Sequence, residues 1–114
     1  MFIVSNFRIK IFDSAPRRRL DQVSLEFFYF AREFAEAHGD CNFDARLALG
    51  LARSLLTSTR FEMDPKFSRS MMLRARYLIE RLLGHRQQLA AEPHTPAAAL
   101  DWNGFRLDPA TLIP

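Results

Sequence analysis

Three stretches of the chain carry apolar residues at intervals of three and four, the spacing that places them on one face of an α-helix. The pattern predicts helices over residues 16–37, 43–58 and 65–84. Gly39 suits the left-handed position that commonly follows a helix, and Asn42 is the expected N-cap of the second helix. For the third helix we expect Asp64 as the cap, Pro65 in the first position and Gly84 at the end.

The apolar faces of these helices should pack against one another. The predicted core consists of Phe27, Phe30, Phe34, Leu51, Leu55, Met71, Leu78 and Leu82. Gly50 lies in the middle of the second helix, where glycine costs about 1 kcal/mol relative to alanine. We therefore expect a neighbouring backbone or a bulky Phe side chain to approach Gly50 closely.

The two ends of the chain follow other patterns. Phe7, Ile9 and Ile11 alternate with basic residues, which predicts a short strand within residues 2–12. Residues 92–99 are rich in Pro and Ala and indicate a linker. An Asn-Gly pair then lies between Trp102 and Phe105 and favours a hairpin turn, and the apolar residues around it should dock on the helices.

The predicted fold is mainly α: a three-helix, bundle-like domain with a short N-terminal β-strand and a partly extended C-terminal tail. Residues 1–90 form the helical part, and residues 91–114 form the linker and docking tail of the same domain. The strand is expected to pair with the tail near residues 105–107. A length of 114 residues allows one such domain and little else.

Composition narrows the class of protein. Apolar residues make up 48% of the chain and charged residues 25%, which excludes wholesale disorder. The longest run of only apolar and glycine residues, 47–52, is far shorter than a membrane span. We expect no secretory signal at the N-terminus, and the single cysteine, Cys41, suits a reducing compartment. The expected location is the cytoplasm.

No motif predicts a reaction. His38 and Cys41 are two ligand types at close spacing, but a zinc site needs two further ligands that the sequence does not pair with them. We interpret Cys41 as a reduced, half-buried and non-catalytic thiol. A phosphate-binding glycine loop, a nucleophile elbow and a dinucleotide fingerprint are all missing from the sequence. We therefore expect no metal, no cofactor and no enzymatic activity.

Arg supplies fourteen of the sixteen basic residues, while the net charge is only +3. This bias is typical of a GC-rich, bacterial gene. If the first helix begins near Ser14, then Arg17, Arg18 and Arg19 fall in its first turns and become a candidate anion-binding site. If the helix begins near Leu20 instead, the three arginines belong to a solvated loop. We favour the second interpretation.

Charge is distributed unevenly between the first and third helices. Residues 20–38 hold four acidic residues and one basic residue, whereas residues 66–86 hold six basic residues and one acidic residue. Leu25 and Tyr29 point away from the predicted core of the first helix, among acidic residues. On the third helix a similar patch is formed by Leu73, Tyr77, Arg69, Arg74, Arg76 and Arg81. Either these patches bind a partner, or the tail covers them.

These features favour a small cytoplasmic accessory or regulatory protein that acts by binding an unidentified protein partner. They also predict a homodimer in which the first helix of one copy contacts the third helix of the other, with Tyr29 and Tyr77 at the contact. The alternative is a nucleic-acid-binding regulator that places the arginines of the third helix on phosphates. We expect no membrane partner.

Overall fold

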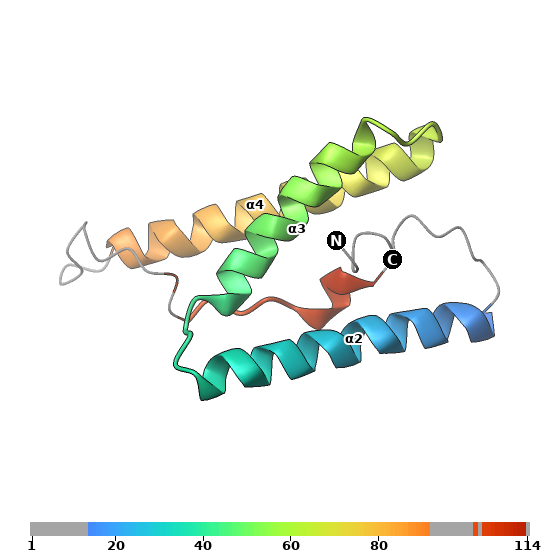
Figure 1. Ribbon diagram of the computed structural model, residues 1–114. Coiled ribbons are helices and arrows are strands. Elements are labelled where there is room, and N and C mark those ends of the chain that lie inside the picture. The colour runs from blue at the N-terminus through green and yellow to red at the C-terminus, as the bar shows by residue number, and fades with distance from the viewer. Residues whose placement is uncertain (1–13, 92–101, 103, 114) are drawn as a thin grey trace.

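The computed structural model describes residues 14–91, 102 and 104–113 (Figure 1). The described elements are α2 (Ser14–Ala37), α3 (Phe43–Thr59), α4 (Pro65–Ala91) and a short 3₁₀ helix, η2 (Pro109–Leu112). The prediction of a mainly α-helical chain with three helices is therefore confirmed. The predicted N-terminal strand lies outside the described residues.

Most of the predicted helix ends agree with the structure. Gly39 adopts a φ of 74° directly after α2, and the Asp64 carboxylate accepts a hydrogen bond from the Lys66 backbone N–H at 3.0 Å. Asn42 is the N-cap residue of α3, as predicted, but its side chain makes no capping hydrogen bond, because Oδ1 accepts instead from the Trp102 N–H at 3.0 Å. The predicted end of α4 is wrong.

Helix α4 does not end at Gly84 but continues to Ala91. Glycine inside a helix costs only about 1 kcal/mol, and tertiary contacts on both sides of Gly84 exceed that cost. Leu82 is buried, and the His85 ring lies 5.6 Å from the ring of Phe105. These contacts carry the helix past the glycine.

The molecule has three layers (Figure 1). Helices α3 and α4 are joined by a short turn, run in opposite directions and pack directly on each other. The C-terminal tail, red in Figure 1, runs between this pair and α2. Direct contact between α2 and α3 is sparse, and α2 also contacts η2 of the tail.

The buried core lies mainly between α3, α4 and the tail. Its apolar members are Phe28, Ala45, Ala48, Leu51, Ala52, Leu55, Met71, Ala75, Leu78, Leu82, Phe105, Leu107 and Leu112. All five core residues predicted on α3 and α4 are in this set. The three predicted on α2 are wrong: Phe27, Phe30 and Phe34 are 55%, 70% and 59% exposed.

Helix α2 instead buries the adjoining face, which carries Ser24, Phe28 and Ala35. The reason is electrostatic. On this face Arg32 reaches the buried carboxylate of Asp44 at the start of α3. A rotation of α2 that buried the Phe side chains would carry Arg32 to the opposite side and leave a buried carboxylate without its cation, at a cost of several kcal/mol.

The tail makes the predicted turn but not a hairpin. The Phe105 N–H donates to the Trp102 carbonyl at 3.0 Å, and Gly104 has a φ of 84°. Among the described residues of the tail no strand follows this turn. Both backbone polar groups of Leu107 bond to side chains, because its N–H donates to Asp44 and its carbonyl accepts from Arg32.

Gly50 has no close neighbour, contrary to the expectation from sequence. A Cβ built on Gly50 would meet nothing within 4 Å, and the residue is exposed in the middle of α3. We expect Gly50→Ala to raise the free energy of unfolding by about 0.5–1 kcal/mol, because alanine restricts the unfolded chain at no steric cost. Urea denaturation of the variant measures this, and a loss of stability would show that α3 needs the glycine.

Candidate protein-interaction surfaces

Four of the residues predicted to bind a partner border one groove on α4. Leu73, Tyr77, Arg69 and Arg74 line an open cavity of about 560 Å³. Ala110 and Thr111 of η2 form its opposite wall. We call this cavity the α4 groove. The tail therefore borders this patch without covering it.

The α4 groove combines an apolar floor with a basic rim. Leu73 and Tyr77 are 53% and 45% exposed, so the tail leaves them accessible. Arg74 is partly buried and its Nη1 donates to the Ile113 carbonyl at 2.8 Å. Burial lowers the pKa of Arg74 from its ordinary value, because the charged form loses water. Arg74 thus holds the tail, while Lys66 and Arg69 supply the exposed cations of the rim.

The other two arginines of the predicted patch do not join the groove. Arg76 donates from Nε to Glu80 at 2.8 Å, one turn along the same helix. The guanidinium of Arg81 lies over the Phe105 ring, 5.3 Å from its centroid. The arginines of α4 are therefore distributed over different sides of the helix and are largely engaged within the molecule.

On α2 the predicted partner-binding pair, Leu25 and Tyr29, exposes less apolar surface than neighbouring residues do. Leu25 is half-buried, and Tyr29 is 45% exposed with its ring 5.5 Å from that of the buried Phe28. The larger apolar surface consists of Val23, Phe27, Phe30 and Phe34, which are 49–70% exposed. We call these four residues the α2 seam.

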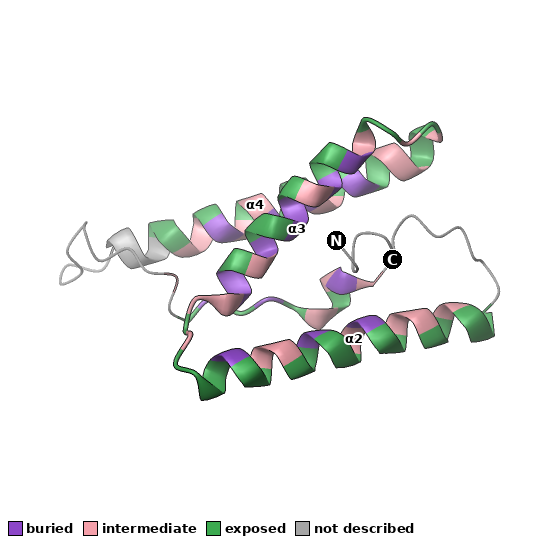
Figure 2. Cartoon of the chain, viewed as in Figure 1, coloured by how far each residue is buried: buried purple, intermediate pink, exposed green. Residues whose placement is uncertain are grey.

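The α2 seam is the feature that the sequence interpretation missed. Its apolar residues occur at spacings of four, three and four, and this spacing predicts a face buried in the core as readily as an exposed contact face. Figure 2 shows the consequence: the buried positions of α2 follow the edge that faces the tail, and much of the rest of the helix is exposed. The seam therefore belongs to the surface of the molecule.

The arginine run at the start of α2 lies within the helix. Because α2 begins at Ser14, the interpretation of residues 17–19 as a loop is wrong. Arg17 forms an ion pair with Asp21 at 3.0 Å, one turn later, while Arg18 and Arg19 are exposed. The candidate anion site of Arg17, Arg18 and Arg19 stays a prediction.

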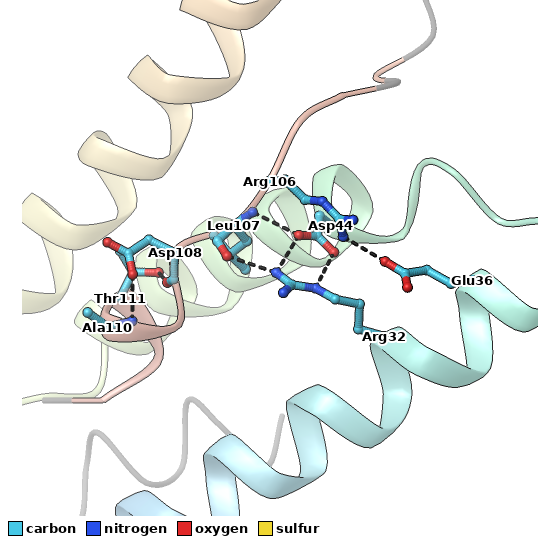
Figure 3. A network of polar contacts seen from close by, with 8 residues as sticks. All are labelled: Arg32, Glu36, Asp44, Arg106, Leu107, Asp108, Ala110 and Thr111. Carbon is cyan, nitrogen blue, oxygen red and sulfur yellow. Dashed lines mark hydrogen bonds and ion pairs between the residues drawn. The ribbon is translucent and has the colours of Figure 1, made fainter.

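A polar network lies between α2, α3 and the tail (Figure 3). Asp44 is 5% exposed and accepts hydrogen bonds from Arg32 Nε at 3.1 Å, from Arg32 Nη2 at 2.6 Å and from the Leu107 N–H at 2.8 Å. Arg32 Nη2 also donates to the Leu107 carbonyl at 2.9 Å. The network therefore connects α2, α3 and the tail through one buried carboxylate.

A second, exposed ion pair extends the network. Arg106 Nη1 donates to Glu36 at 2.7 Å, and this hydrogen bond together with the charge of Glu36 raises the pKa of Arg106. Cys41 borders a cavity of about 340 Å³ beside these residues and is exposed rather than half-buried, so that detail of the prediction is wrong. Its reduced, non-catalytic state stays a prediction.

Two features, a cluster of metal ligands and a membrane-spanning helix, are absent from the part of the chain that the structure describes. Residues 14–91, 102 and 104–113 contain no group of three or more His, Cys, Asp or Glu side chains that could hold a metal ion. Across the same ranges, no helix combines the length and the apolar character needed to cross a membrane.

The chain was compared with protein-family models, with curated proteins and with solved structures. None of the three comparisons found a match. The function of the chain is therefore inferred from two surfaces, the α2 seam and the α4 groove.

Proposed function

We propose that this chain is a small, non-enzymatic accessory protein that acts by binding proteins, including copies of itself. The observation that carries the proposal is the exposure of the α2 seam. A cytoplasmic location in a bacterial cell belongs to the same proposal, supported by the single cysteine and the arginine-rich composition.

The size of the exposed apolar surface supports this function. A Phe side chain presents about 200 Å², and the three of the seam are each more than half exposed. They leave about 350 Å² of aromatic surface on one side of one helix, to which Val23 adds. A patch of this size approaches the largest that monomeric proteins expose, and such patches commonly bind other proteins.

Internal packing gives no reason to expose these residues. Phe28 and Ala35 on the same helix are buried, so α2 has a separate face that attaches it to the domain. Aromatic side chains on a second, solvent-facing side add nothing to that attachment. We therefore infer that their function is contact with something outside the described residues.

The proposal predicts that the seam is covered in the cell. We expect a photoreactive benzoylphenylalanine at position 30 to cross-link to protein when intact cells of the source organism are irradiated. The same residue at position 53, an exposed site on α3 away from both surfaces, is the matched control. Cross-linked protein at position 30 but not at position 53 is the expected result, and equal yields at both positions would contradict the proposal.

Binding of nucleic acid is the less favoured function. It needs several free cations on one face to neutralise phosphates. Arg74, Arg76 and Arg81 already contact the tail or another side chain of the same chain. This leaves the α4 groove with too few exposed cations for an extended phosphate backbone, although its basic rim suits an acidic side chain of a protein.

A further inference from the structure

We propose that the partner of the α2 seam is a second copy of this chain, and that the two α2 helices pair antiparallel about a two-fold axis near their midpoints. This inference rests on the proposed protein-binding function and names the partner. It replaces the contact of α2 with α4 that the sequence suggested.

The spacing of the seam is that of a coiled coil. Pro16, Leu20 and the four seam residues follow one another at intervals of four, three, four, three and four. Apolar residues at alternating intervals of three and four form the contact stripe of two paired helices. Pro16 is exposed and Leu20 is half-buried, so the stripe extends along nearly the whole of α2.

An antiparallel arrangement about the middle of the helix pairs large side chains of one copy with small side chains of the other. The midpoint of α2 (Ser14–Ala37) lies between Leu25 and Glu26. A two-fold axis beside Leu25, next to this midpoint, places Phe34 opposite Pro16, Phe30 opposite Leu20 and Phe27 opposite Val23, each pair occurring twice. Every aromatic ring then meets a smaller apolar residue, as close packing of side chains requires. A parallel pair would place each Phe against its own copy.

The charges beside the stripe favour the same orientation. Arg19, Glu26 and Glu33 recur every seven residues along one flank of the seam, and all three are exposed. In the antiparallel pair Arg19 of each copy lies beside Glu33 of the other, and only Glu26 meets its own copy. In a parallel pair a residue on this flank lies beside the residue five positions further along the other copy, so the three would meet positions 24, 31 and 38, none of which is an acidic residue or an arginine. Charged flanking residues set the orientation of paired helices in this way.

The surface area that two α2 seams can bury together is sufficient for a weak dimer. The Phe side chains of two copies together offer about 700 Å², and the flanking residues bring the total to about 1,000 Å², near the lower limit of specific interfaces. Helix α2 forms one outer layer of the molecule, so its seam is accessible to a second copy (Figure 1). We therefore expect a dissociation constant on the order of 10 μM.

Sedimentation of the purified full chain in a Cys41→Ser background tests the dimer. We expect a reversible monomer–dimer equilibrium between about 1 μM and 1 mM, and Phe30→Ser should weaken it at least about tenfold. Tyr77→Ser is the matched control, since it removes an exposed aromatic residue of α4. It should leave the equilibrium unchanged. Circular dichroism should show both variants folded, because both side chains are largely exposed.

Cross-linking tests the orientation. A cysteine at Glu26→Cys lies near the proposed axis and should cross-link to its own copy with a short bis-maleimide. A cysteine at Glu33→Cys lies about 24 Å along the helix from its copy and should not. A mixture of Arg19→Cys and Glu33→Cys proteins should yield the mixed dimer. Cross-linking of position 33 to itself would indicate a parallel pair and overturn the proposal.

Three other results of these experiments would identify a different partner for the α2 seam. A dimer that Tyr77→Ser dissociates and Phe30→Ser does not would favour the contact of α2 with α4. A chain that dimerises only after residues 1–12 are removed would show that this segment covers the seam. A protein that stays monomeric, yet is cross-linked in cells from position 30 to a different protein, would refute the second copy and retain the proposed function. Each of these results overturns the antiparallel pair.

Discussion

Replacing Asp44 by Ala should lower the free energy of unfolding by about 3–5 kcal/mol, a large share of the stability of a domain of this size. The substitution removes the acceptor of three hydrogen bonds and leaves Arg32 partly buried without its counter-charge (Figure 3). It also leaves the Leu107 N–H without its acceptor. We expect the attachment of α2 to α3 and the tail to weaken, since Asp44 is the acceptor that joins all three elements.

Urea denaturation followed by circular dichroism measures this loss. The control is Glu36→Gln, which breaks the exposed ion pair with Arg106 and should change stability little, because water screens that pair. Arg32→Ala and Asp44→Ala together should cost less than the sum of the two single changes, since they remove the same interaction. Equal effects of Asp44→Ala and Glu36→Gln would contradict the assigned importance of the buried pair.

The second large effect separates two neighbouring aromatic residues of α2. Phe28→Ala should cost about 3–5 kcal/mol, because it leaves a cavity in the core. Phe28 is fully buried, and its ring also contacts the guanidinium of Arg32 at 4.3 Å. Phe30→Ala should change the stability of the monomer by no more than about 0.5 kcal/mol, because its side chain is 70% exposed.

Both variants should be compared at a protein concentration well below the dimer dissociation constant, since association adds to apparent stability. Under these conditions the two midpoints of denaturation report on the monomer alone. If Phe30→Ala destabilises the monomer as strongly as Phe28→Ala, then α2 packs through the seam and the assignment of its faces is wrong.

The packing of α3 on α4 could be predicted from the sequence because it is local. Leu51, Leu55, Met71, Leu78 and Leu82 lie on two helices joined by a short turn, and each helix has one stripe that faces the other. The spacing of apolar residues then determines which side chains meet. The groove residues Leu73 and Tyr77 were found by the same reasoning, as apolar residues directed away from that stripe.

The orientation of α2 could not be predicted in this way. The helix has two apolar faces, and the larger one, with the three Phe residues, is on the outside. The choice between them depends on Arg32, whose partners Asp44 and Leu107 lie 12 and 75 residues further along the chain. The single arginine among the four acidic residues of positions 20–37 was the only local signal, and the pattern of hydrophobic positions does not contain it.

The position of the tail determines the order in which the molecule can assemble. Contacts between distant residues form late, because closing a long loop costs entropy that the local pairing of α3 and α4 avoids. During synthesis α2 emerges first, but Leu107, to which Arg32 bonds, follows it by 75 residues. At about 5–20 residues per second, this interval lasts about 4–15 s. Until the tail is made, the side of α2 that packs on it has no partner there, so we expect the nascent chain to expose apolar surface after α3 and α4 have paired.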